Sequence, residues 1–261
     1  MREKEIRAVF FDIDGTLVSF KTHSMPSSTK EALEKLRARG IKMFIATGRS
    51  PLLVDNVDKS MFDGIIGLNG QYCEVDGEIV HSHFIPAGDV RGAKSFLRKH
   101  NVAALFEAPD KLSLNLTNDM VDEGARLVDI RMPDPTHIDD IDDNNILQLI
   151  FFGGPEYESE LLEAMPSCVA TRWTPLLSDI IPRGGGKHVG VEKILAHFGI
   201  AREECMAFGD GENDITMLQY AGTGIAMGNA APIVKQAADY VTTSVDSNGI
   251  SKALKYYRLI K

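Results

Sequence analysis

The chain has 261 residues, which is long enough for an α/β core and an inserted or appended smaller domain. Its hydrophobic fraction of 44% and charged fraction of 25% are ordinary for a soluble globular protein. Its formal net charge of −9 leaves no surplus of Lys and Arg to neutralise a phosphate backbone, so we expect no nucleic-acid partner. No apolar run approaches the length of a membrane span. Cys73, Cys168 and Cys205 are odd in number and scattered, as is typical of reduced thiols. We therefore expect a cytoplasmic protein without a membrane partner. A monomer or weak homodimer is our hypothesis for its oligomeric state, which no sequence pattern determines.

The stretch Ala8–Leu17 begins with four apolar residues and runs directly into two carboxylates, Asp12 and Asp14. A short, continuously apolar run predicts a strand buried on both faces, as in parallel α/β sheets. Ligands of such sheets bind beyond the carboxyl ends of the strands, which is where both carboxylates fall. Gly15 then permits a sharp turn, and Thr16 adds a hydroxyl.

The next segment continues the β–α–β rhythm. A helix is expected to follow Ser28, whose spacing from Glu31 favours a capping box. A second strand runs into Thr47, Gly48 and Arg49, so polar residues again follow a strand's carboxyl end. The predicted elements are a helix over 29–39, strands over 41–46 and 64–68, Asn69-Gly70 after the latter, and a hairpin turn at Asp76-Gly77.

The sequence pattern changes between residues 83 and 182. Strands there follow one another with intervening helices, which predicts a separate α+β module. The expected elements are helices over 90–100 and 120–128, and strands over 103–107, 112–117, 146–152, 169–173 and 178–181. An acidic run, Asp139–Asn145, lacks the central Gly and terminal Glu of a calcium loop, so it is interpreted as a solvated turn or a helix start. Arg172 and Trp173 are suited to contact a sugar ring, although packing of the tryptophan is the preferred interpretation.

The tail restores the α/β pattern. Gly184-Gly185-Gly186-Lys187 opens a helix that ends at Gly199, and a strand over 205–208 runs into the segment Gly209–Asp214. A helix to residue 221, a strand over 224–227, a helix over 232–238 and a last helix from residue 250 complete the chain. The outer segments therefore belong to one sheet, and the middle segment is an insertion.

These motifs, in this order, resemble those of the haloacid dehalogenase (HAD) superfamily of phosphohydrolases. The matching segments are Asp12-Ile13-Asp14-Gly15-Thr16, Thr47-Gly48-Arg49, Lys187 and Gly209-Asp210-Gly211-Glu212-Asn213-Asp214. The insertion, Asn69-Gly70 and Gly224–Ala230 resemble the Cof-type subfamily with a class II, B subtype cap, which includes bacterial hexose-phosphate phosphatases. The resemblance implies a Rossmann-like parallel-sheet core (residues 1–82 and 184–261) that carries catalysis and an inserted α+β cap domain (residues 83–183).

The resemblance implies a phosphatase of small phosphorylated metabolites, chiefly sugar (hexose) phosphates. Asp12 would attack phosphorus and form an aspartyl-phosphate, while Asp14 would protonate the leaving oxygen and then act as base. Thr47 and Lys187 would complete the catalytic set. The implied substrate-binding residues are Thr47, Gly48, Arg49, Lys187 and Asn213. The implied cofactor is Mg²⁺, held by Asp12, Asp14, Asp210 and Asp214.

Alternatives remain at some positions and for the function. Arg49 is equally suited to a surface salt bridge, and Asp214 to capping the following helix. A dehalogenase is disfavoured because Asp14 and the Asp210/Asp214 pair are all present. A sugar phosphomutase, or a metabolite-binding module without turnover, stays open. Ile181 stands where many Cof-type members carry Asn, so its consequence for specificity is open too.

Overall fold

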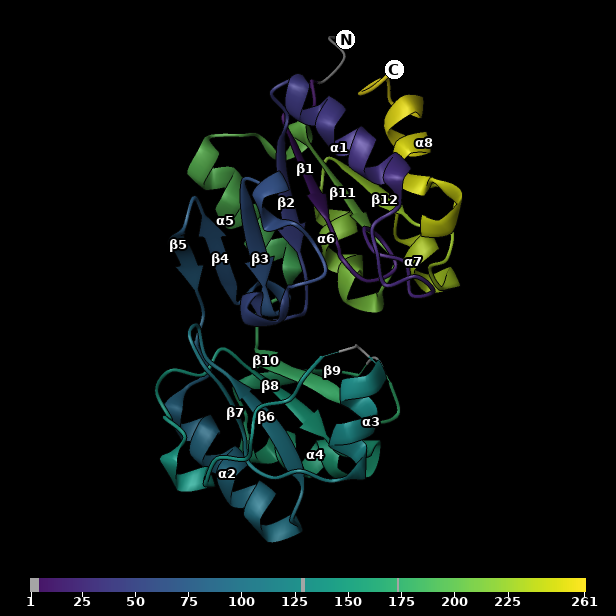
Figure 1. The fold of residues 1–261 in the computed structure, drawn as a ribbon. Helices are drawn as coiled ribbons and strands as arrows, with labels where there is room; N and C mark the ends of the chain where they lie inside the picture. Colours follow the sequence, from purple (N-terminus) through teal and green to yellow (C-terminus); the bar gives the residue numbers. More distant parts are fainter. Residues whose placement is uncertain (1–4, 128–129, 173) are drawn as a thin grey trace. The chain divides into compact units, whose positions relative to one another are not determined.

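A computed structural model describes residues 5–127, 130–172 and 174–261. The chain divides into two compact units. The large unit combines the chain up to His81 with Gly186–Lys261, and the small unit is Ser82–Gly185. Each unit contains one sheet of the described strands (Figure 1). The catalytic and cap roles that the sequence assigns to these parts stay predictions.

The large sheet has the order β13-β12-β11-β1-β2-β3-β4-β5. The pairs from β13 through β3 are parallel, and β4 runs antiparallel to β3. Its strands are β1 (Ala8–Phe11), β2 (Lys42–Ala46), β3 (Gly64–Gly67), β4 (Tyr72–Val75), β5 (Glu78–Ser82), β11 (Cys205–Gly209), β12 (Thr223–Ala226) and β13 (Tyr240–Val241).

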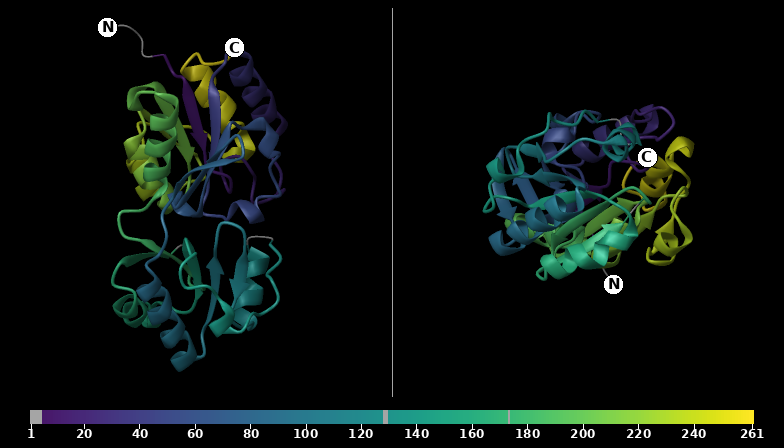
Figure 2. Two further views of the ribbon diagram at one scale, coloured as in Figure 1. Left: turned by 90° about the vertical axis from the view of Figure 1, so that its left-hand side faces the viewer. Right: turned by 90° about the horizontal axis from the view of Figure 1, so that it is seen from below.

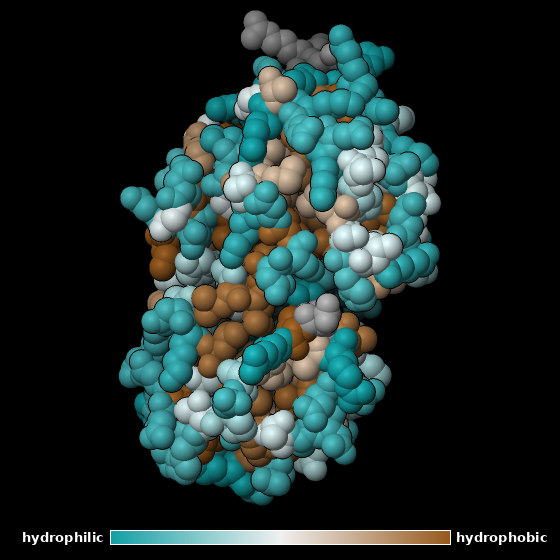
Figure 3. Space-filling view, in the orientation of Figure 1, coloured by the Kyte–Doolittle hydropathy of each residue, from teal (hydrophilic) through white to brown (hydrophobic). Residues whose placement is uncertain are grey.

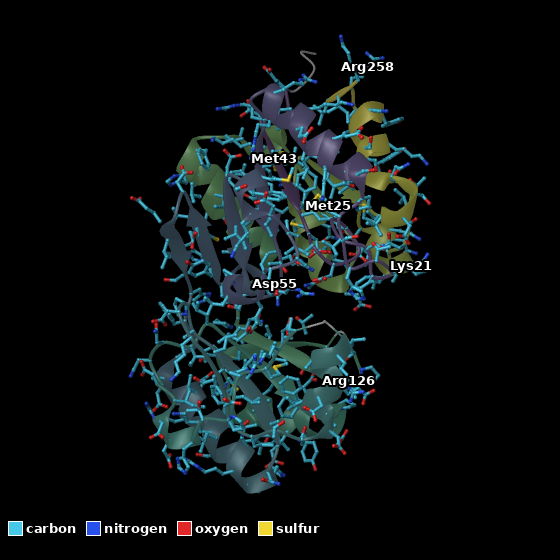
Figure 4. All side chains as sticks on the ribbon, in the orientation of Figure 1. Lys21, Met25, Met43, Asp55, Arg126 and Arg258 are labelled. Atoms are coloured by element: carbon cyan, nitrogen blue, oxygen red, sulfur yellow. The ribbon has the colours of Figure 1, made fainter. Side chains whose placement is uncertain are left out.

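Helices cover both faces of the large sheet, which is why β1 is apolar throughout (Figures 1 and 2). Val9 and Phe11 face the core beneath α1 (Ser27–Ala38) and α8 (Gly249–Tyr256). Ala8 and Phe10 face the opposite core, which is covered by α5 (Lys187–Phe198), α6 (Ile215–Tyr220) and α7 (Pro232–Gln236). Met25 and Met43 point inward, whereas Lys21 and Arg258 point outward (Figure 4).

The small sheet is antiparallel, with the order β7-β6-β8-β10-β9. One face packs against α2 (Ala87–His100) and α4 (Pro155–Ala164), and the other against α3 (Asp119–Leu127). The strands are β6 (Ala103–Glu107), β7 (Leu112–Leu114), β8 (Gln148–Phe152), β9 (Cys168–Arg172) and β10 (Ser178–Pro182). Short 3-10 helices fill the connections of both units: Pro51–Leu53, Lys59–Met61, Leu68–Gly70, Ile138–Asp140, Arg202–Glu204, Glu212–Asp214 and Val245–Ser247.

The predicted fold class, a parallel α/β core with an inserted α+β segment, is confirmed. The capping box is wrong: α1 has no side-chain cap, because the Ser28 hydroxyl instead donates to Asn248 Oδ1 at 2.7 Å. Helix α4 was not predicted, and Trp173 lies outside the described residues. The three cysteines are free, as the sequence predicts, and all three are buried.

The helices that cover the large sheet expose polar side chains to solvent. The face over α1 and α8 is mostly hydrophilic (Figure 3). Among the described residues, no helix combines the length and the apolar character that crossing a membrane requires.

Candidate active site

The site begins where neighbouring parallel strands end. β11, β1 and β2 are adjacent, and the register pairs Phe11 with Phe208 on one side and with Ile45 on the other. Because parallel strands present their carboxyl ends at one sheet edge, the residues that follow them meet there. Asp12 follows β1, Thr47 follows β2, and Asp210 follows β11.

Lys187, the first residue of α5, supplies the ammonium group of this edge. Its side chain is completely buried, and Nζ lies 2.7 Å from Asp12 Oδ1 and 2.6 Å from Asp214 Oδ1. A buried ammonium is costly without charged partners, and two charge-assisted hydrogen bonds supply them. The structure therefore brings together Asp12, Lys187 and Asp214, which are far apart in the sequence.

Asp214 is engaged at both oxygens. Oδ1 accepts from Lys187, and Oδ2 accepts the backbone N–H groups of Asp210 and Gly211, each at 2.9 Å. It makes no side-chain cap to α6, so the capping alternative is wrong. The carboxylate instead ties the loop after β11 to Lys187.

Asp210 is held by two neutral donors. The Thr16 hydroxyl donates to Oδ1 at 3.2 Å, and Asn229 Nδ2 donates to Oδ2 at 2.9 Å. The same Asn229 amide contacts the Gly15 carbonyl oxygen at 2.9 Å, while its Oδ1 accepts the Val245 N–H at 3.0 Å. Asn229 therefore links the loop after β12 to the two loops that carry the aspartates.

Thr47, Gly48 and Asn213 are joined by Asn69, which follows β3. Asn69 has a left-handed backbone (φ 52°) and is buried. Its N–H donates to the Thr47 carbonyl at 3.1 Å, and its Oδ1 accepts from Asn213 Nδ2 at 3.0 Å. The side-chain amide also lies near Gly48, 3.1 Å from where a Cβ on that glycine would stand.

Arg49 contacts Asp14. The guanidinium donates through Nε to Asp14 Oδ2 at 2.7 Å and through a terminal nitrogen to Oδ1 at 2.8 Å. This bidentate pair joins the loop after β1 to the loop after β2. The predicted salt bridge of Arg49 is therefore present, but it is partly buried instead of lying on the surface, and its partner is a predicted catalytic residue.

Several negative charges are concentrated here. Burial, and next the charge of Asp214, raises the pKa of Asp12 well above its usual range, against the opposing effect of Lys187. The same two causes raise the pKa of Asp210 to about 7. Burial by itself lowers the pKa of Lys187, but the charges of Asp12 and Asp214 outweigh it and raise that pKa.

The cluster fits a bound cation. One oxygen from each of Asp12, Asp210 and Asp214 lies within 4.8 Å of the other two. Within this described cluster, three carboxylates exceed the single charge of Lys187, and oxygen donors suit hard divalent cations. A cation is therefore compatible with both the charge and the donor set.

The family follows from comparison. The chain matches the model of the haloacid dehalogenase-like hydrolases over residues 9–254 and belongs to this family. The predicted superfamily and enzyme class, a HAD-type phosphatase, are thereby confirmed.

Three individual relatives match this chain over nearly their whole length. The Bacillus subtilis (strain 168) protein YkrA is 33% identical, covering 98% of this chain and 99% of its own. A structure described as the HAD subclass IIB sugar phosphatase BT4131 is 41% identical with a TM-score of 0.91, covering 97% of this chain and 100% of its own. BT1666 from Bacteroides thetaiotaomicron, described among phosphatases of this superfamily, is 36% identical with a TM-score of 0.91, covering 99% and 97%.

Sequence reasoning assigned no role to Asn229 or Asn69. Both stand in segments that resemble the subfamily, Gly224–Ala230 and Asn69-Gly70, and this was the available signal. Their contacts join loops that are distant in sequence, so the pattern alone could not assign them a partner.

Proposed function

We propose that this protein is a Mg²⁺-dependent phosphatase of small phosphorylated metabolites, chiefly sugar phosphates. The observation that carries the proposal is the buried Lys187, bonded to both Asp12 and Asp214 beside Asp210 at one sheet edge. A carboxylate held between an ammonium and a prospective cation site is suited to attack a phosphate ester, because these charges offset its repulsion from the dianion.

In the first step, an Asp12 oxygen forms a bond to phosphorus while the ester P–O bond breaks. The Asp14 carboxylic acid gives its proton to the departing oxygen, so the alcohol leaves neutral. The products are the alcohol, an aspartyl-phosphate at Asp12 and an ionised Asp14.

In the second step, Asp14 takes a proton from water as the water oxygen bonds to phosphorus. The Asp12–phosphorus bond breaks, inorganic phosphate leaves, and both carboxyl groups return to their starting states. Proton and bond counts balance over the cycle, with Asp14 acting first as acid and then as base.

The metal would be held directly by Asp12, Asp210 and the Asp14 carbonyl oxygen. Asp214 would act through water, because the Lys187 ammonium and two backbone N–H groups already use most of its acceptor capacity. When bound, Mg²⁺ would supply positive charge that stabilises the phosphoryl oxygens.

The substrate phosphate would be held by Thr47, Gly48, Lys187 and Asn213. The Thr47 hydroxyl oxygen already accepts the Arg49 N–H at 3.1 Å, so its own hydrogen is available to donate to a phosphate oxygen. Asn213 is oriented by its bond to Asn69.

We propose residues 1–82 and 184–261 as the catalytic domain and residues 83–183 as the cap that selects the leaving group. Two relatives support a small phosphorylated substrate. BT4131 is described as a sugar phosphatase, and YcsE of Bacillus subtilis (strain 168), 26% identical over 98% of this chain, is named a 5-amino-6-(5-phospho-D-ribitylamino)uracil phosphatase. A cytoplasmic location and a monomer or weak homodimer complete the proposal.

The test is phosphate release from a panel of hexose phosphates, nucleotides and p-nitrophenyl phosphate, with and without Mg²⁺, for the natural protein and Asp12→Asn. We expect Mg²⁺-dependent release that the substitution abolishes. Release that is unchanged in Asp12→Asn would remove the nucleophile from the proposal. Transfer of phosphate between sugar positions would favour a mutase, and binding without release a metabolite-binding module.

A further inference from the structure

The Arg49–Asp14 pair has the geometry of a positioning contact. Both guanidinium bonds are short, 2.7 and 2.8 Å, and they reach different oxygens of the same carboxylate. The arginine side chain is 13% exposed and the aspartate side chain 30% exposed. We propose that Arg49 is a positioning residue that orients the Asp14 carboxyl group for proton transfer to the leaving oxygen. This inference rests on the proposed function, in which Asp14 is the general acid.

A bidentate pair fixes the orientation of the carboxylate as well as its distance from the arginine. The planar guanidinium aligns the carboxylate plane with its own, which a single ammonium contact does not do. A carboxylate has about four lone-pair sites, and the two arginine bonds use two of them. Lone pairs therefore remain on Asp14 to carry and release a proton while the arginine holds its orientation.

The backbones of both partners are fixed. The Arg49 N–H donates to Thr47 Oγ1 at 3.1 Å, and its carbonyl accepts the Leu68 N–H at 3.0 Å, so this residue is anchored at the ends of β2 and β3. Asp14 forms an isolated bridge with Val18, and the next N–H, of Gly15, donates to the Val18 carbonyl at 2.8 Å. The two side chains therefore extend from backbone positions that are held in place, unlike an exposed ion pair on mobile segments.

The consequence depends on the leaving group. A hexose 6-phosphate releases an alkoxide, which needs a well-placed proton as the P–O bond breaks. p-Nitrophenyl phosphate releases a stable phenolate, which needs little help from an acid. If Arg49 acts through Asp14, its loss impairs the first substrate selectively; if it holds the phosphate group common to both, its loss impairs both equally.

The experiment compares kcat/KM for these two substrates, because kcat/KM reports the steps up to departure of the leaving group. For Arg49→Ala we expect kcat/KM to fall by about 10- to 100-fold on the hexose phosphate, the usual loss for residues that orient a reacting group, with a change below threefold on the aryl phosphate. Arg49→Lys, which keeps the charge without the bidentate geometry, should show the same selectivity. Asp14→Asn should show it more strongly.

Equal losses on both substrates would overturn the inference in favour of phosphate binding, and no loss on either would reduce the pair to a structural contact. Arg7→Ala serves as the matched control. It breaks another arginine–carboxylate pair of the large unit, with Glu204 at 3.1 Å, and should leave the substrate ratio unchanged. If Arg49→Ala does not fold by circular dichroism, Arg49→Lys decides. Failure of the proposed function is separate, since the natural protein would then release phosphate from neither substrate.

Discussion

Gly15 and Gly40 form a matched pair for testing how tightly the site is built. Both have left-handed backbones, with φ of +83° and +71°, so replacing either with Ala costs about 1–2 kcal/mol of folding free energy. Their surroundings differ. A Cβ on Gly15 would lie 2.1 Å from Asp210 Oδ2 and 2.7 Å from the Phe20 ring, whereas a Cβ on Gly40 meets nothing within 4 Å.

In Gly15→Ala, Asp210 must move by about 1 Å to make room, and a displacement of that size can lower a catalytic rate by about 100-fold. We therefore expect Gly40→Ala to lose about 1–2 kcal/mol in urea unfolding and Gly15→Ala to lose at least as much, because the clash adds to the backbone cost. Only Gly15→Ala should also lose about 100-fold in Mg²⁺-dependent kcat/KM on p-nitrophenyl phosphate. Full activity in Gly15→Ala, or an equal loss in Gly40→Ala, would refute the reasoning that Asp210 must keep its place.

Two further predictions concern Asn229 and the buried Glu107. Asn229→Ala removes a donor from Asp210, so Mg²⁺ affinity measured by calorimetry without substrate should fall about 10- to 100-fold; unchanged affinity would show that Asn229 does not orient that carboxylate. Burial, then the charge of Asp179, raises the pKa of Glu107 well above its usual range, although a bond from Gln148 opposes this. The folded state thus keeps a proton that the unfolded state loses above about pH 4, and stability falls as pH rises from there to the raised pKa. Glu107→Gln should remove this fall in stability. If the urea midpoints of the natural protein and of Glu107→Gln change with pH in parallel, the prediction is wrong.

The sequence predicted those parts of the fold that depend on local pattern. The apolar run before Asp12 identified the central strand, and Gly199, whose φ is +58°, ended α5 where the pattern placed it. Helix α4 was missed although Tyr157, Leu161 and Ala164 stand at helical spacing and pack on one core of the small unit. The cap of α1 was misjudged because Ser28 finds a partner 220 residues away.

The candidate site was likewise predicted only in part. The residues that follow strand ends could be predicted, because strand ends can be located from the local sequence and parallel strands share an edge. Three contacts join segments that are distant in the sequence, and only the assembled sheet brings them together. They are the Arg49–Asp14 pair, the hydrogen bond from Asn229 to Asp210, and the two hydrogen bonds that Lys187 donates to Asp12 and Asp214. The sequence placed Lys187 at a helix start, but its role came from the family resemblance, because a lysine that opens a helix carries no sign of its partner.

The central claim is that Asp12 carries the phosphoryl group, and trapping that group tests it most directly. Asp14→Asn mixed with p-nitrophenyl phosphate and Mg²⁺ should accumulate the aspartyl-phosphate, because the leaving group departs without an acid while hydrolysis lacks its base. Borohydride reduction followed by peptide mass spectrometry should then find homoserine at position 12 and nowhere else. A stoichiometric burst of nitrophenolate with position 12 unmodified would contradict the account.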